Sequence, residues 1–362
     1  RYWPKRFEMT DRDQLFSGVK EVDEKLQIDK NSLNDFLRNL LGNKIIINDI
    51  KQFKGGQSNP TYLISTNEKD LVIRRKPPGK LLKSAHAVDR EYRVITALNQ
   101  TDVPVPKTYA YCDDTDIIGT PFFVMDHVKG NIFWELLLPS CEHDQRRSIY
   151  LSMNDTIAKL HNVDFKNVGL SDYGKHEEYM SRQIHRWTKQ YKDSETQDIP
   201  EMNNLIEWLP KNLPDEQDTT IVHGDFRLDN MIFDKKNNSV VAILDWELST
   251  LGNPIADFTY HMMSWRLPVG ARGMGIMGAD LQKLNIPKED EYAELYYKKT
   301  GRNKIRNWDF YMAYNIFRLA GIAQGIVGRV RDGTASSTQA KEYESFVPIL
   351  GKLGWNIVER LN

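Results

Sequence analysis

Cysteine is scarce in this chain of 362 residues, which contains only Cys112 and Cys141. Two cysteines are too few for the disulfide framework of a small secreted protein, and they suit a reducing compartment. No apolar run approaches the roughly 18 residues that a membrane-spanning helix needs. We therefore expect a cytoplasmic protein that does not associate with a membrane, with mitochondria and peroxisomes left open as locations.

Neither sign of charge dominates, because 49 Lys and Arg residues face 50 Asp and Glu residues and leave a formal net charge of -1. A chain without a basic excess offers no electrostatic case for binding nucleic acid. The sequence also contains no signal-peptide core, no internal repeat and no C-terminal S-K-L peroxisomal signal. With 40% hydrophobic residues, it predicts a globular protein with one large domain or two lobes. The sequence leaves the oligomeric state open.

The most informative stretch runs from residue 221 to residue 247. Two short apolar runs, at residues 231–233 and 240–244, flank a segment of turn-forming residues, a pattern that predicts a β-hairpin. Folding of this hairpin would bring Asn230 and Asp245 together at its base, in an oxygen-rich site that suits a hard divalent cation. Polar side chains stand at both ends of the hairpin: His223, Asp225, Asp229 and Asn230 before it, and Asp245 and Glu247 after it.

The spacing of these residues indicates a reaction. Asp225 precedes Asn230 by the interval that separates Asp and Asn in the kinase catalytic loop H-R-D-L-x-x-x-N, and Asp245 takes the position of the D-F-G aspartate. The pattern predicts phosphoryl transfer, with Asp225 as the general base and with Asn230 and Asp245 as ligands of Mg²⁺. An acidic surface hairpin is the simpler alternative, because Asp and Asn are common in turns. That alternative does not explain why acids flank the apolar hairpin on both sides.

The motifs in this block are His223-Gly224-Asp225, Asn230, Asp245-Trp246-Glu247, the run of residues 248–254, and Ala256-Asp257. Together they resemble the aminoglycoside phosphotransferase and choline kinase group of protein-kinase-like enzymes. The sequence is most similar to the kinase-like domain that precedes an acyl-CoA dehydrogenase in some two-domain proteins, and to free-standing bacterial homologues of that domain. The resemblance covers nearly the whole chain from about Asn43 onward.

This resemblance implies an α+β, protein-kinase-like fold with two lobes: a small antiparallel sheet with a helix, then a larger, mainly helical lobe, with Mg-ATP between them. Residues 1–42 would form an N-terminal helical extension. Residues 43–128 would form the nucleotide-binding N-lobe, and residues 129–362 the catalytic and substrate-binding C-lobe. The chain would then carry only the kinase-like half of the two-domain proteins.

A glycine-containing turn joins two of the strands predicted in the N-lobe, at residues 44–53 and 61–65. Backbone N–H groups can approach a phosphate closely where no Cβ intervenes, so the turn is a candidate phosphate-binding loop. An ordinary hairpin turn explains the same residues. The candidate ligands in the turn are Gly55, Gly56, Gln57, Ser58 and Asn59.

The next predicted strand, at residues 70–75, carries the candidate cation for the ATP phosphates. Arg74 takes the place of the Lys in the kinase strand V-A-I-K, although Lys76 is close enough to have that role instead. Arg and Lys are not equivalent, because a planar fork replaces a compact ammonium. Glu91, on a helix predicted at residues 84–99, matches the glutamate that pairs with the cation, and a solvated helix charge is its alternative reading. His86 reads as a surface or cap residue.

A strand predicted at residues 121–128 turns abruptly from apolar to polar, as expected where the chain passes from one lobe to the other. The resemblance implies that the adenine ring binds the backbone of this crossing, from Asp126 to Val128, with Met125 in the wall of the adenine pocket. In the catalytic loop, Arg227 would offset charge near the transferred phosphoryl group. Asp257 would accept hydrogen bonds from backbone amides and brace that loop.

Arginine residues suggest the class of acceptor. Arg182 and Arg186 lie on a helix predicted at residues 177–191, and with Arg266 and Arg272 they would favour an anionic substrate if they border the cleft. A solvated helix face is the simpler reading of this cluster. The related domains fused to acyl-CoA dehydrogenases act on hydroxylated acyl chains carried by coenzyme A, so a hydroxyacyl-CoA or another anionic metabolite with a hydroxyl group is the leading acceptor.

Two other functions compete with an ATP-dependent phosphotransferase. The first is a catalytically weak pseudokinase that binds a nucleotide or a partner, which only the replacement of Lys by Arg74 favours. The second is a nicotinamide-dependent oxidoreductase, because residues 273–278 satisfy G-x-G-x-x-G. No βαβ unit surrounds those glycines, so a loop is the better interpretation. Farther on, Arg318 lies among apolar residues and would pair with a buried carboxylate.

Overall fold

A computed structural model of the chain describes residues 17–55, 59–79, 86–215, 218–270, 273–332 and 337–361, with the side chains of residues 337–342 left out. The chain forms two compact units. The first contains the described residues up to Ser171, together with Arg227–Ser249 and Asp280–Pro287, and the second contains Asp172–Phe226, Thr250–Ala279 and the residues from Lys288 onward. These units differ from the predicted segments 1–42, 43–128 and 129–362, whose boundaries remain predictions.

An antiparallel six-stranded sheet dominates the first unit, with the strand order β1-β2-β3-β4-β6-β5. The four strands that the sequence predicted at residues 44–53, 61–65, 70–75 and 121–128 are all present, with ends that differ by a few residues. The short edge strand β1 was not predicted. The strands are β1 (Val19–Lys20), β2 (Ile47–Phe53), β3 (Thr61–Thr66), β4 (Asp70–Arg75), β5 (Thr108–Cys112) and β6 (Phe122–Asp126).

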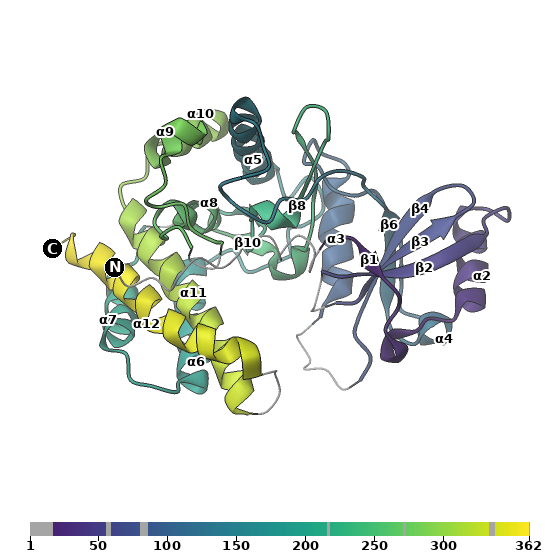
Figure 1. The fold of residues 1–362 in the computed structure, drawn as a ribbon, viewed down its shortest axis with the longest axis horizontal. Helices are drawn as coiled ribbons and strands as arrows, with labels where there is room; N and C mark the ends of the chain where they lie inside the picture. The colour runs from purple at the N-terminus through teal and green to yellow at the C-terminus, as the bar shows by residue number, and fades with distance from the viewer. Residues whose placement is uncertain are drawn as a thin grey trace. The chain divides into compact units, whose positions relative to one another are not determined.

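Two helices cover the two faces of this sheet, α2 (Lys30–Leu41) and α3 (Val88–Leu98) (Figure 1). Neighbouring strand residues point to opposite faces. Phe122 contacts Phe36 of α2, with the ring centroids 5.2 Å apart, whereas Phe123 contacts Tyr92 of α3 at 6.0 Å. The same alternation along β4 places Ile73 in the core on the α2 side, so Arg74 faces α3.

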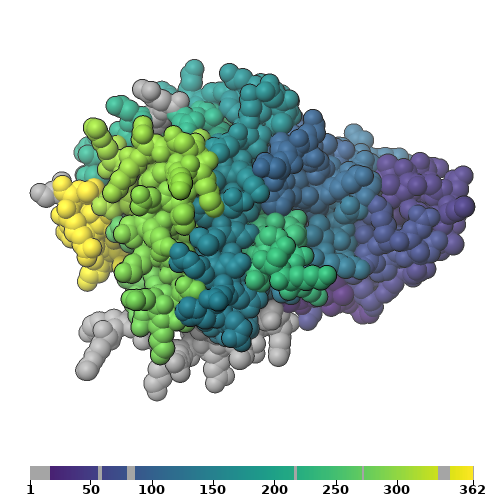
Figure 2. Space-filling model, turned by 90° about the horizontal axis from the view of Figure 1, so that it is seen from above, coloured from purple at the N-terminus to yellow at the C-terminus, as the bar shows by residue number. Residues whose placement is uncertain are grey.

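Helix α2 is the helix that the sequence predicted before Gly42. It begins where the Asp29 side chain accepts hydrogen bonds from two backbone N–H groups, and it ends at Gly42. Its fully buried leucines, Leu33 and Leu37, join the core beneath the sheet. The purple to blue atoms in the space-filling view belong to described residues between 17 and about 130 and lie together in that view (Figure 2).

The first unit is completed by helices α4 (Thr115–Ile118), α5 (His143–Asn162) and α9 (Leu281–Leu284), and by the hairpin of β8 (Met231–Phe233) and β9 (Val240–Ile243). The hairpin is the one predicted from the sequence. Its first strand is fixed by Asn131, since the two backbone N–H···O bonds between Asn131 and Phe233 are each 2.8 Å long. Helix α5 holds the second strand, because Ser152 accepts from the Val240 N–H group at 2.7 Å.

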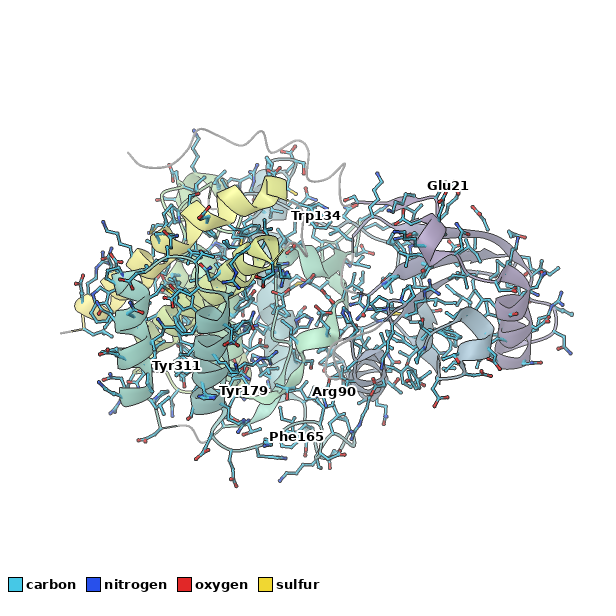
Figure 3. The ribbon with its side chains drawn as sticks, turned by 90° about the horizontal axis from the view of Figure 1, so that it is seen from below. Glu21, Arg90, Trp134, Phe165, Tyr179 and Tyr311 are labelled. Atoms are coloured by element: carbon cyan, nitrogen blue, oxygen red, sulfur yellow. The ribbon has the colours of Figure 1, made fainter. Side chains whose placement is uncertain are left out.

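The second unit is mainly helical, and its longest helix is α11, whose side chains are mostly buried. Helices α6 and α12 run beside it (Figure 1). Tyr179 begins α6 and Tyr311 lies near the start of α11, as Figure 3 labels. The elements are α6 (Tyr179–Ser194), α7 (Pro200–Trp208), β7 (Thr220–Val222), β10 (Thr250–Gly252), α8 (Pro254–Met262), α10 (Glu289–Thr300), α11 (Trp308–Arg331) and α12 (Ser337–Glu359).

The glycines at 273, 275 and 278 lie in a loop of the second unit, as the sequence predicted. A Cβ atom on Gly275 would lie 2.2 Å from the Leu267 carbonyl oxygen, so this glycine permits a close approach of two backbone segments. The glycine pattern therefore has a packing role. None of the helices in the described part of the chain combines the length and apolarity that crossing a membrane requires.

Candidate active site

The first unit contains a buried ionic cluster centred on Arg74. The Nε atom of Arg74 lies 2.8 Å from Glu91 Oε2, and its Nη2 donates to Asp245 Oδ1 at 2.7 Å. Arg74 is 7% exposed and Glu91 is 1% exposed. The predicted pairing of the β4 cation with the α3 glutamate is therefore present. Lys76 instead lies 3.9 Å from Asp89, so it is not the cation that pairs with Glu91.

The electrostatics of this cluster keep Arg74 charged. Burial alone would lower the pKa of its guanidinium, but the Glu91 and Asp245 carboxylates raise that pKa above its ordinary value. Burial raises the pKa of Glu91, and the ion pair with Arg74 opposes this effect. A planar guanidinium can contact both carboxylates at once through different nitrogens, which a single ammonium does less well. Arg74 therefore links strand β4, helix α3 and the end of the β8–β9 hairpin.

Asn59 extends the cluster toward the glycine-containing turn. Its Nδ2 donates to Glu91 Oε1 at 2.9 Å, and its Oδ1 lies 3.0 Å from His86 Nδ1. The sequence predicted that Asn59 would contact phosphate and that His86 would be a surface or cap residue. The structure instead gives the Asn59 side chain a bracing position between Glu91 and His86. Of the other turn residues, Gly55 is described, whereas Gly56, Gln57 and Ser58 lie outside the described residues.

The base of the hairpin holds the two predicted metal ligands. The Leu244 N–H group donates to the Asn230 carbonyl at 2.8 Å, so the residues directly before β8 and after β9 are neighbours, as the sequence predicted. Asp245 has a left-handed backbone conformation, with φ of 64°, which Asp adopts more readily than most residues. Next to it, Trp246 is buried and donates through Nε1 to the Ile243 carbonyl at 3.0 Å, which anchors this end of the hairpin.

The donor set at the hairpin base fits a magnesium ion. Asn230 supplies an amide oxygen and Asp245 a carboxylate, and hard oxygen donors of this kind suit Mg²⁺. Within the described ranges, no group of three or more His, Cys, Asp and Glu side chains is arranged to hold a metal. Protein-only coordination, as in a structural zinc site, is therefore not found in that part of the chain. Mg²⁺ takes few protein ligands and completes its shell with phosphate oxygens and water, which agrees with two ligands here.

The predicted adenine-binding segment is the end of β6. The Asp126 N–H group donates to the Lys107 carbonyl at 2.8 Å, and the His127 N–H group donates to the Asp70 carbonyl at 3.4 Å. These two N–H groups are thus used within the sheet. Met125 is nearly buried and Val128 is partly exposed. An adenine ring that binds this segment would therefore depend on its carbonyls and on the Val128 amide.

In the second unit, Asp257 organises the loop that carries Asp225. Both of its carboxylate oxygens accept backbone hydrogen bonds of 2.8 Å, one from the His223 N–H group and one from the Gly224 N–H group. Gly224 has φ of 83°, a conformation that favours glycine. The Asp225 N–H group donates to His223 Nδ1 at 3.2 Å. The predicted bracing role of Asp257 is confirmed by these contacts.

Asp225 also has partners that the sequence did not predict. Tyr260 of α8 donates to Asp225 Oδ1 at 2.7 Å. Arg318 of α11 donates to the Gly224 carbonyl and lies over the ring of Tyr260. The sequence predicted a buried carboxylate as the partner of Arg318, whereas the observed acceptor is a backbone carbonyl, and the guanidinium itself lies over the rings of Tyr260 and Trp187. No local motif marks Tyr260, because it reads as one more apolar position of a buried helix.

Five further arginines were predicted to act at the site, and the structure describes four of them. Arg227 belongs to the first unit and lies 3.1 Å from Asp229, so its charge is partly neutralised nearby. Arg186 is exposed, with its guanidinium carbon 5.5 Å from the centre of the Trp187 ring, and Arg182 donates to the Lys175 carbonyl at 3.0 Å. Arg266 forms ion pairs of 2.6 Å with Glu289 and 3.4 Å with Asp309.

Arg266 therefore has two carboxylate partners, which offset part of the charge that it could offer to an anionic substrate. Its hydrogen bond to Glu289 and the charges of both carboxylates raise the pKa of Arg266 above its ordinary value, against the effect of burial. Arg272 lies outside the described residues. The substrate roles of Arg182, Arg186 and Arg266 remain predictions.

Known proteins are similar to this chain in sequence, and solved structures are similar to it in fold. The mouse (Mus musculus) acyl-CoA dehydrogenase family member 10 is 42% identical over 345 residues, which cover 95% of this chain and 32% of that protein. The human (Homo sapiens) acyl-CoA dehydrogenase family member 11 is 40% identical over 313 residues, or 86% of this chain and 40% of that protein. The chain therefore spans about a third to two fifths of the length of these relatives.

Solved structures show the same fold. A protein from Ralstonia eutropha, described provisionally as an aminoglycoside phosphotransferase, is 44% identical, with a TM-score of 0.84 over 92% of this chain and 99% of its own. The GDP complex of aminoglycoside 2'-phosphotransferase-IIIa has a TM-score of 0.58 at 13% identity, over 90% of this chain and 99% of its own. The predicted α+β, protein-kinase-like fold is confirmed. Because the model of the phosphotransferase enzyme family also matches residues 49–295, the chain belongs to that family.

Proposed function

We propose that this protein is a Mg²⁺-dependent phosphotransferase that moves the γ-phosphoryl group of ATP to a hydroxyl group of a small molecule. The observation that carries the proposal is the cluster in which Arg74 contacts both Glu91 and Asp245. It places a permanent cation beside a carboxylate suited to Mg²⁺, which is the charge arrangement that triphosphate binding needs. Membership of the phosphotransferase family supports the same reaction class.

We assign the following roles in phosphoryl transfer to residues of this chain. Asp225 accepts the proton of the acceptor hydroxyl as that oxygen forms a bond to the γ-phosphorus and the bond from phosphorus to the ADP oxygen breaks. Asn230 and Asp245 would hold Mg²⁺, which neutralises charge on the phosphates when it is bound. Arg74, braced by Glu91, would contact the phosphates, as would backbone groups from the predicted phosphate-binding residues 55–59. Arg227 offsets charge near the transferred group.

The acceptor that we propose is an anionic metabolite with a hydroxyl group, with a hydroxyacyl-CoA as the first compound to test. Two relatives that match 95% and 86% of this chain are named as acyl-CoA dehydrogenase family members, which links them to acyl-CoA metabolism. Those names refer to whole proteins of which this chain matches only a part. Arg186, exposed beside Trp187, offers a cation that a phosphate of coenzyme A could contact.

A pseudokinase is the second candidate, and one observation favours it. Arg74 replaces the usual lysine, and it already contacts Asp245, a proposed ligand of Mg²⁺. If that contact persists when a nucleotide binds, Asp245 would be a poorer metal ligand. The protein would then bind ATP without transferring its phosphate.

The test is ATP consumption by the purified protein, with and without Mg²⁺, against hydroxyacyl-CoAs, the matching free hydroxy acids, choline and an aminoglycoside. We expect turnover that requires Mg²⁺ and prefers an acyl-CoA. Each non-hydroxylated acyl-CoA serves as the matched control, because it presents the same anion without the attacking oxygen. Nucleotide binding without turnover on any acceptor would favour the pseudokinase.

A further inference from the structure

The Asp225 carboxylate is held by a buried phenol. The hydroxyl group of Tyr260 donates to Asp225 Oδ1 at 2.7 Å, and Tyr260 is only 3% exposed. Asp225 itself is partly exposed. A short hydrogen bond from a buried, packed donor restricts rotation of the carboxylate, so it fixes the directions in which the carboxylate oxygens can accept a proton.

The phenol is in turn held by Arg318, which is also buried. The guanidinium carbon of Arg318 lies 4.4 Å from the centre of the Tyr260 ring and 5.3 Å from that of Trp187, so the cation lies between two aromatic faces. The same guanidinium donates to the carbonyl of Gly224, the residue directly before Asp225. Arg318 therefore contacts both the backbone that carries Asp225 and the side chain that holds its carboxylate.

We propose that Tyr260 is a positioning residue for Asp225, and that Arg318 fixes the position of the Tyr260 side chain relative to the Gly224 peptide. This inference rests on the proposed function, because it assigns the arrangement to the general base of phosphoryl transfer. A carboxylate that rotates would direct a lone pair at the acceptor hydroxyl for only part of the time. Misplacement of a catalytic group by about 1 Å can cost roughly 10²-fold in rate.

A merely structural role for the Tyr260 hydroxyl is the alternative, and the chain offers a matched control for it. Tyr292 of α10 is equally buried, and its hydroxyl lies 2.9 Å from His261 Nε2, which has no assigned part in the chemistry. Each Phe variant removes one side-chain hydrogen bond made by a buried tyrosine, so the two variants should lose similar stability. Of these two hydroxyls, that of Tyr260 is the one that contacts Asp225.

The kinetic arm compares Tyr260→Phe with Tyr292→Phe on the best acceptor found. We expect Tyr260→Phe to lower kcat by about 10- to 100-fold while the KM for ATP stays within about twofold. Tyr292→Phe should keep the wild-type kcat. At Arg318, the Lys variant keeps a charge and a donor and should retain more kcat than the Met variant, which keeps neither. Equal kcat values for Tyr260→Phe and Tyr292→Phe would overturn the inference.

The second experiment measures stability and does not require the protein to be catalytically active. Unfolding by urea is measured for Asp225→Ala, Tyr260→Phe and the double variant, in a double-mutant cycle, because Ala removes the acceptor and Phe removes the donor. Coupling between the two changes supports the contact, and additivity overturns it. The proposed function has its own check, since it requires wild-type turnover that Asp225→Asn abolishes. Absence of wild-type turnover would overturn that function and the catalytic meaning of the contact, while the cycle would still report whether the contact exists.

Discussion

Arg74 and Asp245 are 171 residues apart in the sequence, yet a guanidinium nitrogen of Arg74 lies 2.7 Å from a carboxylate oxygen of Asp245. The contact joins the end of strand β4 to the end of the β8–β9 hairpin within the first unit. Since Arg74 also contacts Glu91, one side chain fixes three segments that the proposed chemistry needs together. The buried charges make this cluster sensitive to any change in the shape of the cation.

Arg74→Lys should weaken ATP binding. An ammonium carries the same charge, but it is compact and does not reproduce the fork that contacts both carboxylates. We expect the Kd for ATP to rise about tenfold, which corresponds to about 1.4 kcal/mol, in isothermal titration calorimetry with Mg²⁺ present. The matched control is Arg75→Lys, because Arg75 is equally buried but donates to the carbonyls of Ile118 and Leu26. An equal loss of ATP affinity in both variants would contradict the assignment of Arg74.

Asp257→Asn should lower both the stability of the protein and its kcat. Asp257 accepts two backbone hydrogen bonds in a buried setting, and an amide turns one of these acceptors into a donor that faces an N–H group. We expect the free energy of unfolding to fall by about 3 kcal/mol in urea denaturation, with a lower kcat. Asp234→Asn is the control, because the partly exposed Asp234 also accepts from two N–H groups, in a turn that Asn tolerates. If the two variants lose equal stability, Asp257 does not brace the loop.

Gly130→Ala should destabilise the connection that follows β6. A Cβ atom at this position would lie 2.4 Å from the Phe233 carbonyl oxygen and 2.5 Å from Ile232 Cγ2, so the backbone of β8 must shift. We expect a loss of about 1–3 kcal/mol in the free energy of unfolding. In Gly321→Ala, by contrast, the nearest atom to the new Cβ is 3.6 Å away, and Ala in helix α11 should raise stability by up to about 1 kcal/mol. An unchanged stability of Gly130→Ala would show that the close contact is absent.

His261 should make the folded state sensitive to acid. Burial lowers its pKa from 6.5 to about 4, although a hydrogen bond with the Phe226 backbone and the charge of Asp257 act in the opposite direction. Between those pH values the unfolded chain binds a proton that the folded chain does not, so stability is complete above pH 6.5 and falls as the pH drops toward 4. The difference corresponds to about 3 kcal/mol.

The variant His261→Gln does not titrate, and its side chain can still bond the Tyr292 hydroxyl. Its free energy of unfolding should therefore fall less between pH 6.5 and pH 4 than that of the wild type, as measured by urea denaturation at several pH values. The exposed histidine His143, changed in the same way, provides the control. Parallel pH profiles for the wild type and His261→Gln would contradict the prediction.

Much of this fold could be predicted because local patterns determine it. The apolar segments of β3 and β4, the helix before Gly42 and the β8–β9 hairpin all follow from short-range sequence patterns and turn residues. The pairing of Arg74 with Glu91 followed from a position within a known motif. Short elements such as β1 were missed, since two residues carry too little pattern to distinguish a strand from a loop.

The contacts that complete the candidate site could not be predicted from spacing. Tyr260 contacts Asp225 only because α8 and the 223–225 loop meet in three dimensions, and Tyr in a buried helix is otherwise an ordinary core residue. The contact of Arg74 with Asp245 depends in the same way on long-range packing. Arg266 gives a further example, because its two carboxylate partners lie 23 and 43 residues away along the chain and could not be identified from local sequence.

The most direct test of the central claim is the transfer of the γ-phosphoryl group from labelled ATP to a hydroxylated acceptor by the wild type and by Asp225→Asn. The account predicts a phosphorylated product with the wild type, a loss of at least about 10²-fold in kcat for Asp225→Asn, and nearly equal ATP affinity in both proteins. Undiminished transfer by Asp225→Asn would contradict the assignment of Asp225 as the general base of this phosphotransferase.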